Sequence, residues 1–393
     1  MIAPIITGLF LLIGHFSVCT WIVNRLHATA LPYRFLKKVD KVWYLFLFGA
    51  PIATVAWWIF RPTHPVLQAD RLLPIAIPYA VICAASAIIA IPVWIRYLMQ
   101  LTITERLVSN HTKVVKIDAE IGFRPIGSPM TRFLTSLPMN QVFQLAVHEK
   151  ALRMPRLNPA LDGLSIAHLS DLHLTGTLTE PFFEQIVERT NQLDADIVVI
   201  TGDIIDKPYC MSWLNTCLAG LKSRNGVYFI LGNHDLRVKN ELGVRNALMQ
   251  NGYFDLGGRS KLIEINGQPI FLGGNELPWF CKATDMSECP SEVNGKRPFQ
   301  IILSHSPDQV YWAQRHDVDL LLAGHTHGGQ IRFPVIGPVF APSRFGVKYA
   351  SGTFFEEPTL MHVSRGISGT RHLRFNCRPE LAKLVLQCER NRS

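Results

Sequence analysis

The sequence predicts an α/β domain that follows a set of N-terminal membrane helices. Two observations lead to this fold class. The first hundred residues contain three long apolar stretches, and five short runs rich in β-forming residues appear after residue 140. Strands that are buried on both faces of an α/β sheet have this nearly uninterrupted apolar character. The chain has 393 residues, which is enough for more than one domain.

The three apolar stretches predict transmembrane helices at about residues 2–23, 42–60 and 72–99. Each is close to the ~20 residues that a helix needs to cross a bilayer. A cleaved signal peptide is not expected, because no basic segment precedes the first stretch and two more stretches follow it. The third stretch is rich in proline, and a buried or interfacial helix remains an alternative there.

The basic residues predict the orientation in the membrane. Five Lys and Arg lie between the first two stretches, two between the second and third, and four more lie at the end of the third or follow it up to residue 116. Basic loops stay inside, so we expect an inner-membrane, multi-pass protein whose N-terminus is outside. The expected organisation is an anchor over 1–100, a connector over 101–140 and a cytoplasmic domain over 141–393.

The net charge of +9 is concentrated near the N-terminus. Residues 1–135 hold 13 Lys and Arg against 5 Asp and Glu, and the remaining residues are nearly neutral. This distribution fits an inner-leaflet anchor, and no nucleic-acid binding is expected. The eight cysteines include no CxxC pair, as expected of reduced thiols, although a Cys281–Cys289 disulfide is an alternative in an oxidising compartment. The sequence carries no signal for the oligomeric state.

Each of the five β-rich runs ends in residues that bind metals. An amphipathic helical pattern, "EPFFEQIVERTNQL", lies between the first two runs and predicts a β-α-β unit. The runs and their terminal residues are "LSIAHLSDLHL" with Asp171 and His173, "DIVVITGDIID" with Asp203, "GVYFILGNHD" with Asn233, His234 and Asp235, "FQIILSHSPD" with His305, and "VDLLLAGHTHGG" with His325 and His327.

The recurrence of these endings predicts a metal site. The last pair alone, in "LLAGHTHGGQ", is more simply explained as two core histidines. Ligand sites in open α/β sheets form beyond the carboxyl ends of the strands, however, and five such ends favour a shared site. Asp, His and Asn without thiolates suit Mn, Fe or Zn. The set is large enough for two ions ~3.5–4 Å apart, the arrangement used for displacement at phosphorus.

The order of these motifs resembles the calcineurin-like metallophosphoesterase superfamily. The elements are "DLH" at 171–173, "GD" at 202–203, "GNHD" at 232–235, "SH" at 304–305 and "GHTH" at 324–327. The sequences "AGHTHGGQI" and "SRGISGTRHLRFNC" further resemble the bacterial membrane-anchored branch of this superfamily. The resemblance covers roughly 140–388 and implies a four-layer α-β-β-α sandwich.

The resemblance also implies the roles of individual residues. One divalent ion, Mn above Fe or Zn, would be held by Asp171, His173, Asp203 and His327, and a second by Asp203, Asn233, His305 and His325. Asp203 would bridge the two ions, and a metal-activated hydroxide would attack phosphorus. His234 would stabilise or protonate the leaving oxygen.

Other residues are candidates for supporting roles. Asn233, His234 and Gly328 are expected to contact substrate, with Arg365 and Arg371, for which ordinary surface arginines are the alternative. Asp235 is a candidate for orienting a histidine. We expect His168 to pack or to support the ligands from behind, and we expect structural or solvated roles for His148, His316, His362 and His372. The segment 275–299, with Trp279 and Phe280, is a candidate lid or membrane-facing flap, and a plain surface loop is the alternative.

These features predict a membrane-anchored phosphohydrolase with two metal ions that cleaves a phosphodiester or pyrophosphate. Tethering to the inner leaflet favours a phosphorylated lipid-linked substrate, and relatives of the branch cleave UDP-diacylglucosamine. The alternatives are a broad phosphodiesterase acting on soluble nucleotides or esters and a nonenzymatic metal-binding membrane scaffold. The complete set of motif ligands argues against the scaffold.

Overall fold

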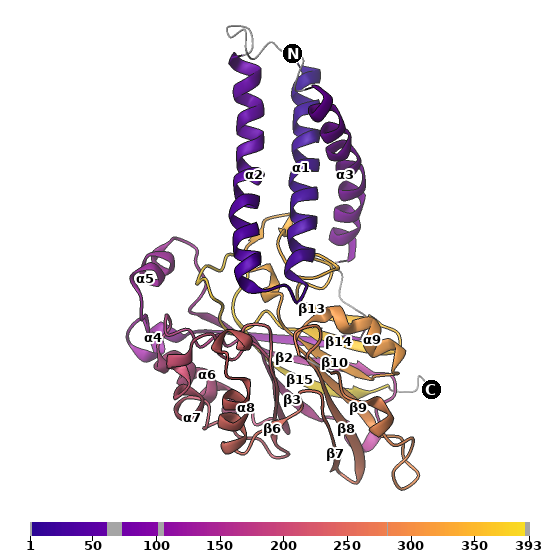
Figure 1. Cartoon of the computed structure of the whole chain (residues 1–393). Coiled ribbons are helices and arrows are strands. Elements are labelled where there is room, and N and C mark those ends of the chain that lie inside the picture. The colour runs from indigo at the N-terminus through magenta and orange to yellow at the C-terminus, as the bar shows by residue number, and fades with distance from the viewer. Residues whose placement is uncertain (1, 61–72, 101–105, 281, 390–393) are drawn as a thin grey trace. The chain divides into compact units, whose positions relative to one another are not determined.

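The computed structural model describes residues 2–60, 73–100, 106–280 and 282–389 (Figure 1). The chain divides into two compact units, Met1–Thr102 and Ile103–Ser393.

The N-terminal unit consists of three helices, α1 (Ile2–His27), α2 (Tyr33–Phe60) and α3 (Leu73–Gln100). All three are long and apolar enough to cross a membrane, and they contain the stretches expected from the sequence. Inside the unit, His15 of α1 bonds the hydroxyl of Tyr79 on α3 (2.5 Å) and the carbonyl oxygen of Leu47 on α2 (2.9 Å). Polar side chains between membrane helices join them in this way, because hydrocarbon offers no other partner.

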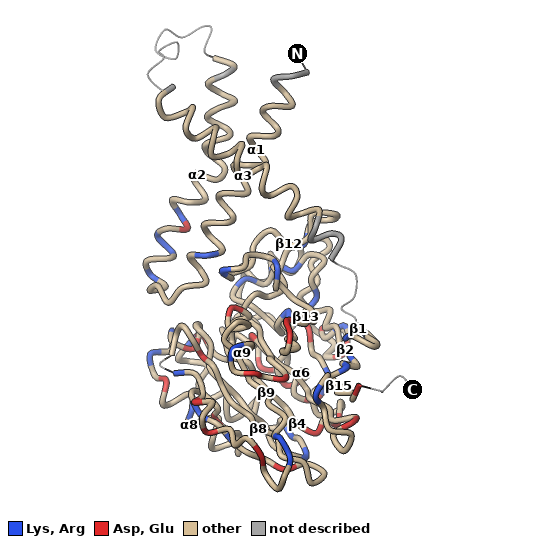
Figure 2. The backbone as a smooth tube through the Cα atoms, turned by 90° about the vertical axis from the view of Figure 1, so that its right-hand side faces the viewer, with Lys and Arg blue, Asp and Glu red and all other residues tan. Residues whose placement is uncertain are grey.

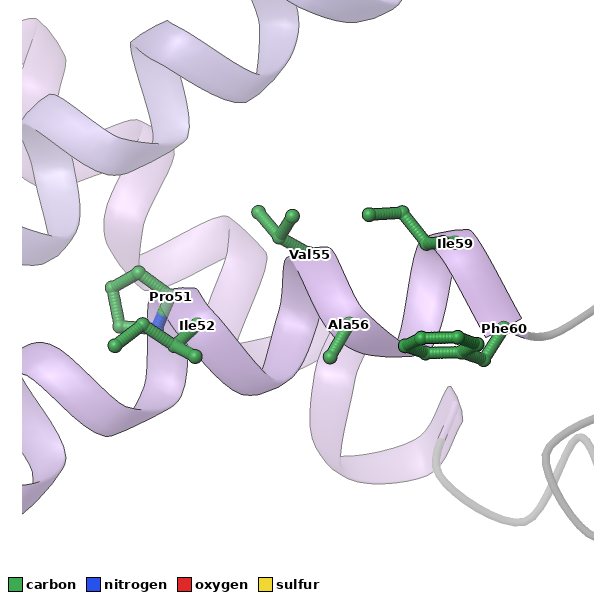
Figure 3. A pocket seen from close by; sticks show the side chains of 6 residues that line it. All are labelled: Pro51, Ile52, Val55, Ala56, Ile59 and Phe60. Atoms are coloured by element: carbon green, nitrogen blue, oxygen red, sulfur yellow. The ribbon is translucent and has the colours of Figure 1, made fainter.

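The outward surface of α2 is apolar near its C-terminal end, as Figure 3 shows for six residues between Pro51 and Phe60. Ile52, Val55 and Ile59 are more than half exposed there. Such a surface is unfavourable in water and favourable against lipid tails, which agrees with the apolar composition of all three helices.

The C-terminal unit is built on two mixed β-sheets. The seven-stranded sheet has the order β1-β2-β15-β3-β4-β5-β6, and the six-stranded sheet has the order β13-β14-β10-β9-β8-β7. A small hairpin pairs β11 with β12. The strands are β1 (Leu107–Lys116), β2 (Gln144–Met154), β3 (Ser165–Leu169), β4 (Ile197–Thr201), β5 (Val227–Ile230), β6 (Phe254–Asp255), β7 (Ser260–Ile265), β8 (Gln268–Asn275), β9 (Phe299–Ser304), β10 (Leu320–Ala323), β11 (Arg332–Phe333), β12 (Gly337–Pro338), β13 (Gly352–Glu356), β14 (Thr359–Val363) and β15 (Glu380–Cys388).

The two sheets pack face to face, and helices cover their outer faces. In β3, Ile166 lies in the core between the sheets, whereas Ala167 and Leu169 lie in the core under the helices. This alternation explains why the five predicted strands are apolar at nearly every position. The helices are α4 (Ile117–Ile121), α5 (Pro129–Ser136), α6 (Glu180–Gln192), α7 (Trp213–Thr216) and α8 (Glu241–Gln250) beside the seven-stranded sheet, and α9 (Val310–Arg315) against the six-stranded sheet. The predicted four-layer α-β-β-α architecture is confirmed.

The β-α-β unit expected at the start of the domain is present, because β3, α6 and β4 follow one another and the two strands pair in parallel. The segment expected as a connector, 101–140, differs from the expectation. It contributes β1, which pairs antiparallel with β2 at the edge of the seven-stranded sheet. Most of the β1 side chains are exposed, so this edge strand lacks the apolar pattern that reveals a central strand.

A chain of buried polar side chains lies between the sheets. Nδ1 of His168 on β3 meets Nδ1 of His362 on β14 (2.9 Å), and Nε2 of His362 meets the ammonium of Lys150 (2.9 Å). Lys150 in turn donates to the carboxylate of Glu380 (2.5 Å), which also accepts the Nε proton of Arg365 (3.1 Å). His168 is therefore buried within a polar network that crosses the sandwich.

This network generates a stability prediction. In Glu380→Ala, Lys150 loses its carboxylate partner in the interior, so the free energy of unfolding should fall by about 3–5 kcal/mol. Glu389→Ala is the matched control, because it removes the partner of Arg106 at the surface, where Glu389 is 50% exposed and we expect a loss of about 0–1 kcal/mol. Thermal unfolding of the detergent-solubilised protein measures both losses. Equal losses in the two variants would contradict a larger contribution of the buried ion pair to the free energy of unfolding.

Candidate metal centre

The seven predicted metal ligands come together at one rim of the sandwich. They follow the carboxyl ends of strands from both sheets, so the site lies where the two sheets meet. The side chains of five are nearly inaccessible, whereas Asn233 is partly exposed and the side chain of His327 is 14% exposed. The ligands are Asp171 and His173 after β3, Asp203 after β4, Asn233 after β5, His305 after β9, and His325 and His327 after β10.

The first cluster contains Asp171, His173, Asp203 and His327. Nε2 of His173 lies 3.2 Å from Nε2 of His327 and 3.6 Å from Oδ2 of Asp203. Nε2 of His327 lies 3.5 Å from Oδ1 of Asp171. Four ligand atoms from three strand ends therefore surround one small volume.

The second cluster contains Asp203, His305, His325 and the amide of Asn233. Nε2 of His305 is its centre and lies 3.3 Å from Oδ1 of Asp203, 3.1 Å from Oδ1 of Asn233, and 3.2 Å from Nδ1 of His325. The two oxygens of Asp203 thus face different clusters, Oδ2 the first and Oδ1 the second.

These distances fit metal coordination. Ligand atoms that each lie ~2.1 Å from one ion stand ~3.0–3.4 Å apart in octahedral or tetrahedral geometry. Most of the measured separations, between 3.1 and 3.6 Å, lie in or close to this range. The donor set of imidazole, carboxylate and amide oxygen also suits divalent ions of the Mn, Fe and Zn type. The residues therefore fit two ions, with Asp203 as the shared ligand.

The protonation states differ among the histidine ligands. Burial lowers the pKa of His173 and His305, but the neighbouring carboxylates outweigh it and raise both, that of His305 to about 9, so a metal must displace a proton from each of these two rings. His325 and His327 behave in the opposite way. Burial, together with the neighbouring His305, holds the pKa of His325 well below its usual value, and burial with His173 does the same for His327. Both rings are therefore neutral and keep a lone pair for a metal. Burial opposes ionisation of Asp203, but the adjacent histidines lower its pKa well below the usual value.

The backbone is strained at the ligands themselves. Five of the seven have a positive φ between 49° and 69°, in the left-handed region that non-glycine residues rarely occupy. Each such residue costs on the order of 1–3 kcal/mol and persists only where surrounding structure enforces it. The strained ligands are Asp171, His173, Asp203, His325 and His327.

Two glycines allow the strand ends to approach this closely. A Cβ on Gly232 would lie 2.4 Å from Oδ1 of Asp203, and a Cβ on Gly324 would lie 2.5 Å from Oδ2 of Asp171. Both distances are shorter than any allowed contact. The glycines of "GNHD" and "GHTH" are therefore required so that backbone can lie directly against the ligands.

His234 lies beside the first cluster, held by a residue that the sequence reasoning missed. One oxygen of Asp206 accepts from Nδ1 of His173 (2.7 Å), and the other accepts from Nδ1 of His234 (2.6 Å) and from Arg237 (2.7 Å). Asp206 thereby fixes the tautomer and direction of both rings. The only available signal was its position three residues after Asp203.

The remaining predicted residues have other surroundings. Asp235 accepts three backbone N–H groups, from Gly232 (2.7 Å), Ile204 (3.0 Å) and Ile205 (2.8 Å), and so ties two ligand loops together instead of orienting a histidine. Its pKa is raised to about 7 by burial and by the nearby Asp203.

Arg365, Arg371 and Gly328 were expected to contact substrate. Arg365 donates to Glu380 and His148, and Gly328 is buried against the Arg365 side chain, whereas Arg371 is exposed. A third arginine of the same segment, Arg374, is fully buried, and its charge contributes to the low pKa of His327. Substrate contacts by Arg365, Arg371 and Gly328 stay a prediction.

The candidate lid packs onto the second cluster at its N-terminal end. The ring of Trp279 lies 4.7 Å from that of His325 and 5.4 Å from that of His305, and Phe280 is buried in the core. Trp279 therefore covers the two histidines, and a role of the segment 275–299 as a lid or membrane-facing flap stays a prediction. Cys289 is a free thiol, and Cys281 lies outside the described residues.

Comparison with known proteins agrees with this geometry. The calcineurin-like phosphoesterase family model matches residues 164–329. The chain is 32% identical over 253 residues to the uncharacterized metallophosphoesterase YkuE of Bacillus subtilis, covering 61% of this chain and 84% of that protein. It is 28% identical to the phosphodiesterase YaeI of Escherichia coli (62% and 88% covered) and 26% identical to the UDP-2,3-diacylglucosamine pyrophosphatase LpxG of Chlamydia trachomatis (67% and 97%).

The chain belongs to the calcineurin-like phosphoesterase family. It is therefore a phosphoesterase, a hydrolase of a family whose members bind two divalent metal ions.

Asp206 generates a prediction that separates positioning from folding. Asp206→Asn keeps the shape but replaces the carboxylate that holds His173 and His234, so metal affinity or turnover should fall by about 10–100-fold. Metal titration and hydrolysis of bis-p-nitrophenyl phosphate measure the two effects. Asp194→Asn, at a site that is 73% exposed, is the control and should change neither. Wild-type metal affinity and turnover in Asp206→Asn would contradict the role.

Proposed function

We propose that this protein is a membrane-anchored phosphohydrolase that uses two divalent metal ions to cleave a phosphodiester or pyrophosphate bond. The observation that carries the proposal is the placement of Asp203, whose two carboxylate oxygens face separate clusters of ligand atoms. The ligands are the seven residues named above. Mn is the preferred metal, with Fe or Zn as alternatives, because the donors are nitrogen and oxygen without thiolate.

The ions and the residues around them would have different roles in the reaction. Two bound ions would supply an activated nucleophile and would neutralise the negative charge that develops on the phosphoryl oxygens. Asp206 holds the proton of His234 on Nδ1, which leaves Nε2 on the side of Arg237 (2.9 Å). We propose that His234 stabilises or protonates the leaving oxygen as an imidazolium, with Asp206 as its counterion and Nε2 as the donor in place of its contact with Arg237. Its side chain is 14% exposed, as a residue that meets substrate must be.

The substrate we favour is a lipid-linked nucleotide such as UDP-diacylglucosamine. Three apolar helices support a substrate that resides in the membrane, and the alignment with LpxG spans 97% of that pyrophosphatase. A phosphodiesterase acting on soluble nucleotides or esters is the second candidate, supported by the likeness to YaeI. A nonenzymatic scaffold would tolerate the loss of ligands, and the motif set is complete.

The substrate proposal predicts the outcome of an activity screen. The purified, Mn-loaded protein should release UMP from UDP-diacylglucosamine in mixed micelles, and chelation should abolish the activity until Mn is restored. Asp203→Ala removes the shared ligand and should abolish turnover, whereas Asp317→Ala, at an exposed site, should not. Hydrolysis of only cyclic nucleotides or bis-p-nitrophenyl phosphate would support the second candidate. Full activity of Asp203→Ala would contradict the metal mechanism itself.

We further propose that the three helices form an inner-membrane anchor over residues 1–100 and that the phosphoesterase unit faces the cytoplasm. The support is the excess of basic residues between the first two helices and after the third. Green fluorescent protein fused after Ser393 should therefore fluoresce, and alkaline phosphatase fused there should be inactive. The reverse pair of results would contradict this orientation.

A further inference from the structure

Two segments beside the metal centre expose many large apolar side chains. Residues 123–139 and 333–340 contain eight of the 17 exposed large hydrophobic residues in the described part of the C-terminal unit. Single exposed apolar residues are ordinary, whereas a concentration of them marks an interaction surface. We name this set the apolar rim; it consists of Phe123, Met130, Phe133, Met139, Phe333, Val335, Ile336 and Phe340.

Both segments pack against the same stretch of chain. These contacts are made by the residues that flank the segments. The backbone N–H of Arg332, just before the second segment, donates to the carbonyl of Phe375 (2.9 Å), and that of Gln141, two residues after the first segment, donates to the carbonyl of Arg374 (2.9 Å). The same stretch contacts the metal centre, because the thiol of Cys377 donates to the carbonyl of His327 (3.3 Å). The apolar rim therefore borders the candidate active site on two sides.

The hairpin of β11 and β12 exposes its apolar residues and has a strained backbone at its tip. Val335, at the tip, is 74% exposed and has a φ of 67°. A β-branched residue is a genuine outlier in this region, where glycine or asparagine would be unstrained and more soluble. Backbone strain of this kind is concentrated at functional sites, so it supports a functional role for the tip of this hairpin.

The charge around the apolar rim is of one sign. Residues 121–148 and 320–355 contain five Lys and Arg and no Asp or Glu. Arg132, on α5, and Arg371, between the two segments, are exposed. The hairpin can be located in Figure 2 by the β12 label, with Lys and Arg in blue. Apolar side chains flanked by arginines complement an anionic membrane surface, where the rings enter the acyl boundary and the arginines meet headgroup phosphates.

The chain itself brings this unit to a membrane. Only six residues separate Gln100, the last residue of α3, from Leu107, the first of β1. Fully extended, this link spans at most ~25 Å. We propose that the apolar rim docks on the anionic bilayer surface, so that the metal centre lies at the boundary where a lipid headgroup is reached. The proposal rests on the membrane anchoring and lipid substrate proposed above.

Photocrosslinking in intact vesicles tests this contact without relying on turnover. The full-length protein carrying p-benzoylphenylalanine at Phe133 or Phe333 is reconstituted in phosphatidylethanolamine vesicles containing radiolabelled phosphatidylglycerol. The matched control is the same replacement at Phe254, which is 39% exposed on the edge strand β6. We expect several-fold more labelled lipid on the two rim positions than on the control. Control-level labelling, or a covalent dimer in place of lipid, would overturn the proposal.

A second measurement separates membrane docking from catalysis. In the double variant Phe133→Ser and Val335→Ser, turnover of UDP-diacylglucosamine in vesicles should fall several-fold, whereas turnover of bis-p-nitrophenyl phosphate should be unchanged. An equal loss on both substrates would contradict docking as the function of the apolar rim. If the enzyme does not act on the lipid substrate at all, the proposed substrate fails, and the crosslinking result still decides the docking proposal.

Discussion

The carboxylate of Asp203 lies between the two clusters of the candidate metal centre, and much of the surrounding structure holds it in that position. Its oxygens face His173 on one side and His305 on the other, at 3.6 and 3.3 Å. These histidines follow strands of different sheets, so the bridge exists only while the sheets are held in register. The contact is reinforced directly, because Nδ1 of His305 donates to the carbonyl of Thr201 on β4 (2.8 Å).

Assembling this centre costs stability that the remainder of the sandwich must offset. Left-handed backbone at five ligands and several buried carboxylates are all unfavourable by themselves. The core between the sheets is apolar over most of its length and provides the compensating burial. The network of His168, His362, Lys150 and Glu380 crosses the same layer and adds directional contacts that fix the relation of the two sheets.

The Glu380 end of that network also connects the interior to the surface around the site. Glu380 accepts both the backbone N–H (3.0 Å) and the Nε proton of Arg365 (3.1 Å), at the start of the segment that packs on the ligands. Further along, the backbone of Ser368 donates to the carbonyl of Asp171 (2.9 Å). The same segment then supports both parts of the apolar rim. Metal ligands, buried charges and the proposed membrane contact thus share one stretch of chain.

Much of this protein is determined by local sequence. The three long apolar helices, the five central strands and the candidate ligand residues at their ends can be recognised in the sequence, because each depends on a short apolar pattern and its terminus. The family motifs contain Asp171, Asp203 and His327, and the structure brings these three residues together in one cluster.

Only the tertiary structure decided how the strands divide between two sheets, and that β1 and β15 flank β2 in the same sheet. It also decided that Asp206 holds two histidines and that Arg365 turns to Glu380. Strand pairing across more than two hundred residues and the direction of a charged side chain depend on distant partners. No local pattern records such partners, because the free energy that selects them arises only when the sheets close on each other.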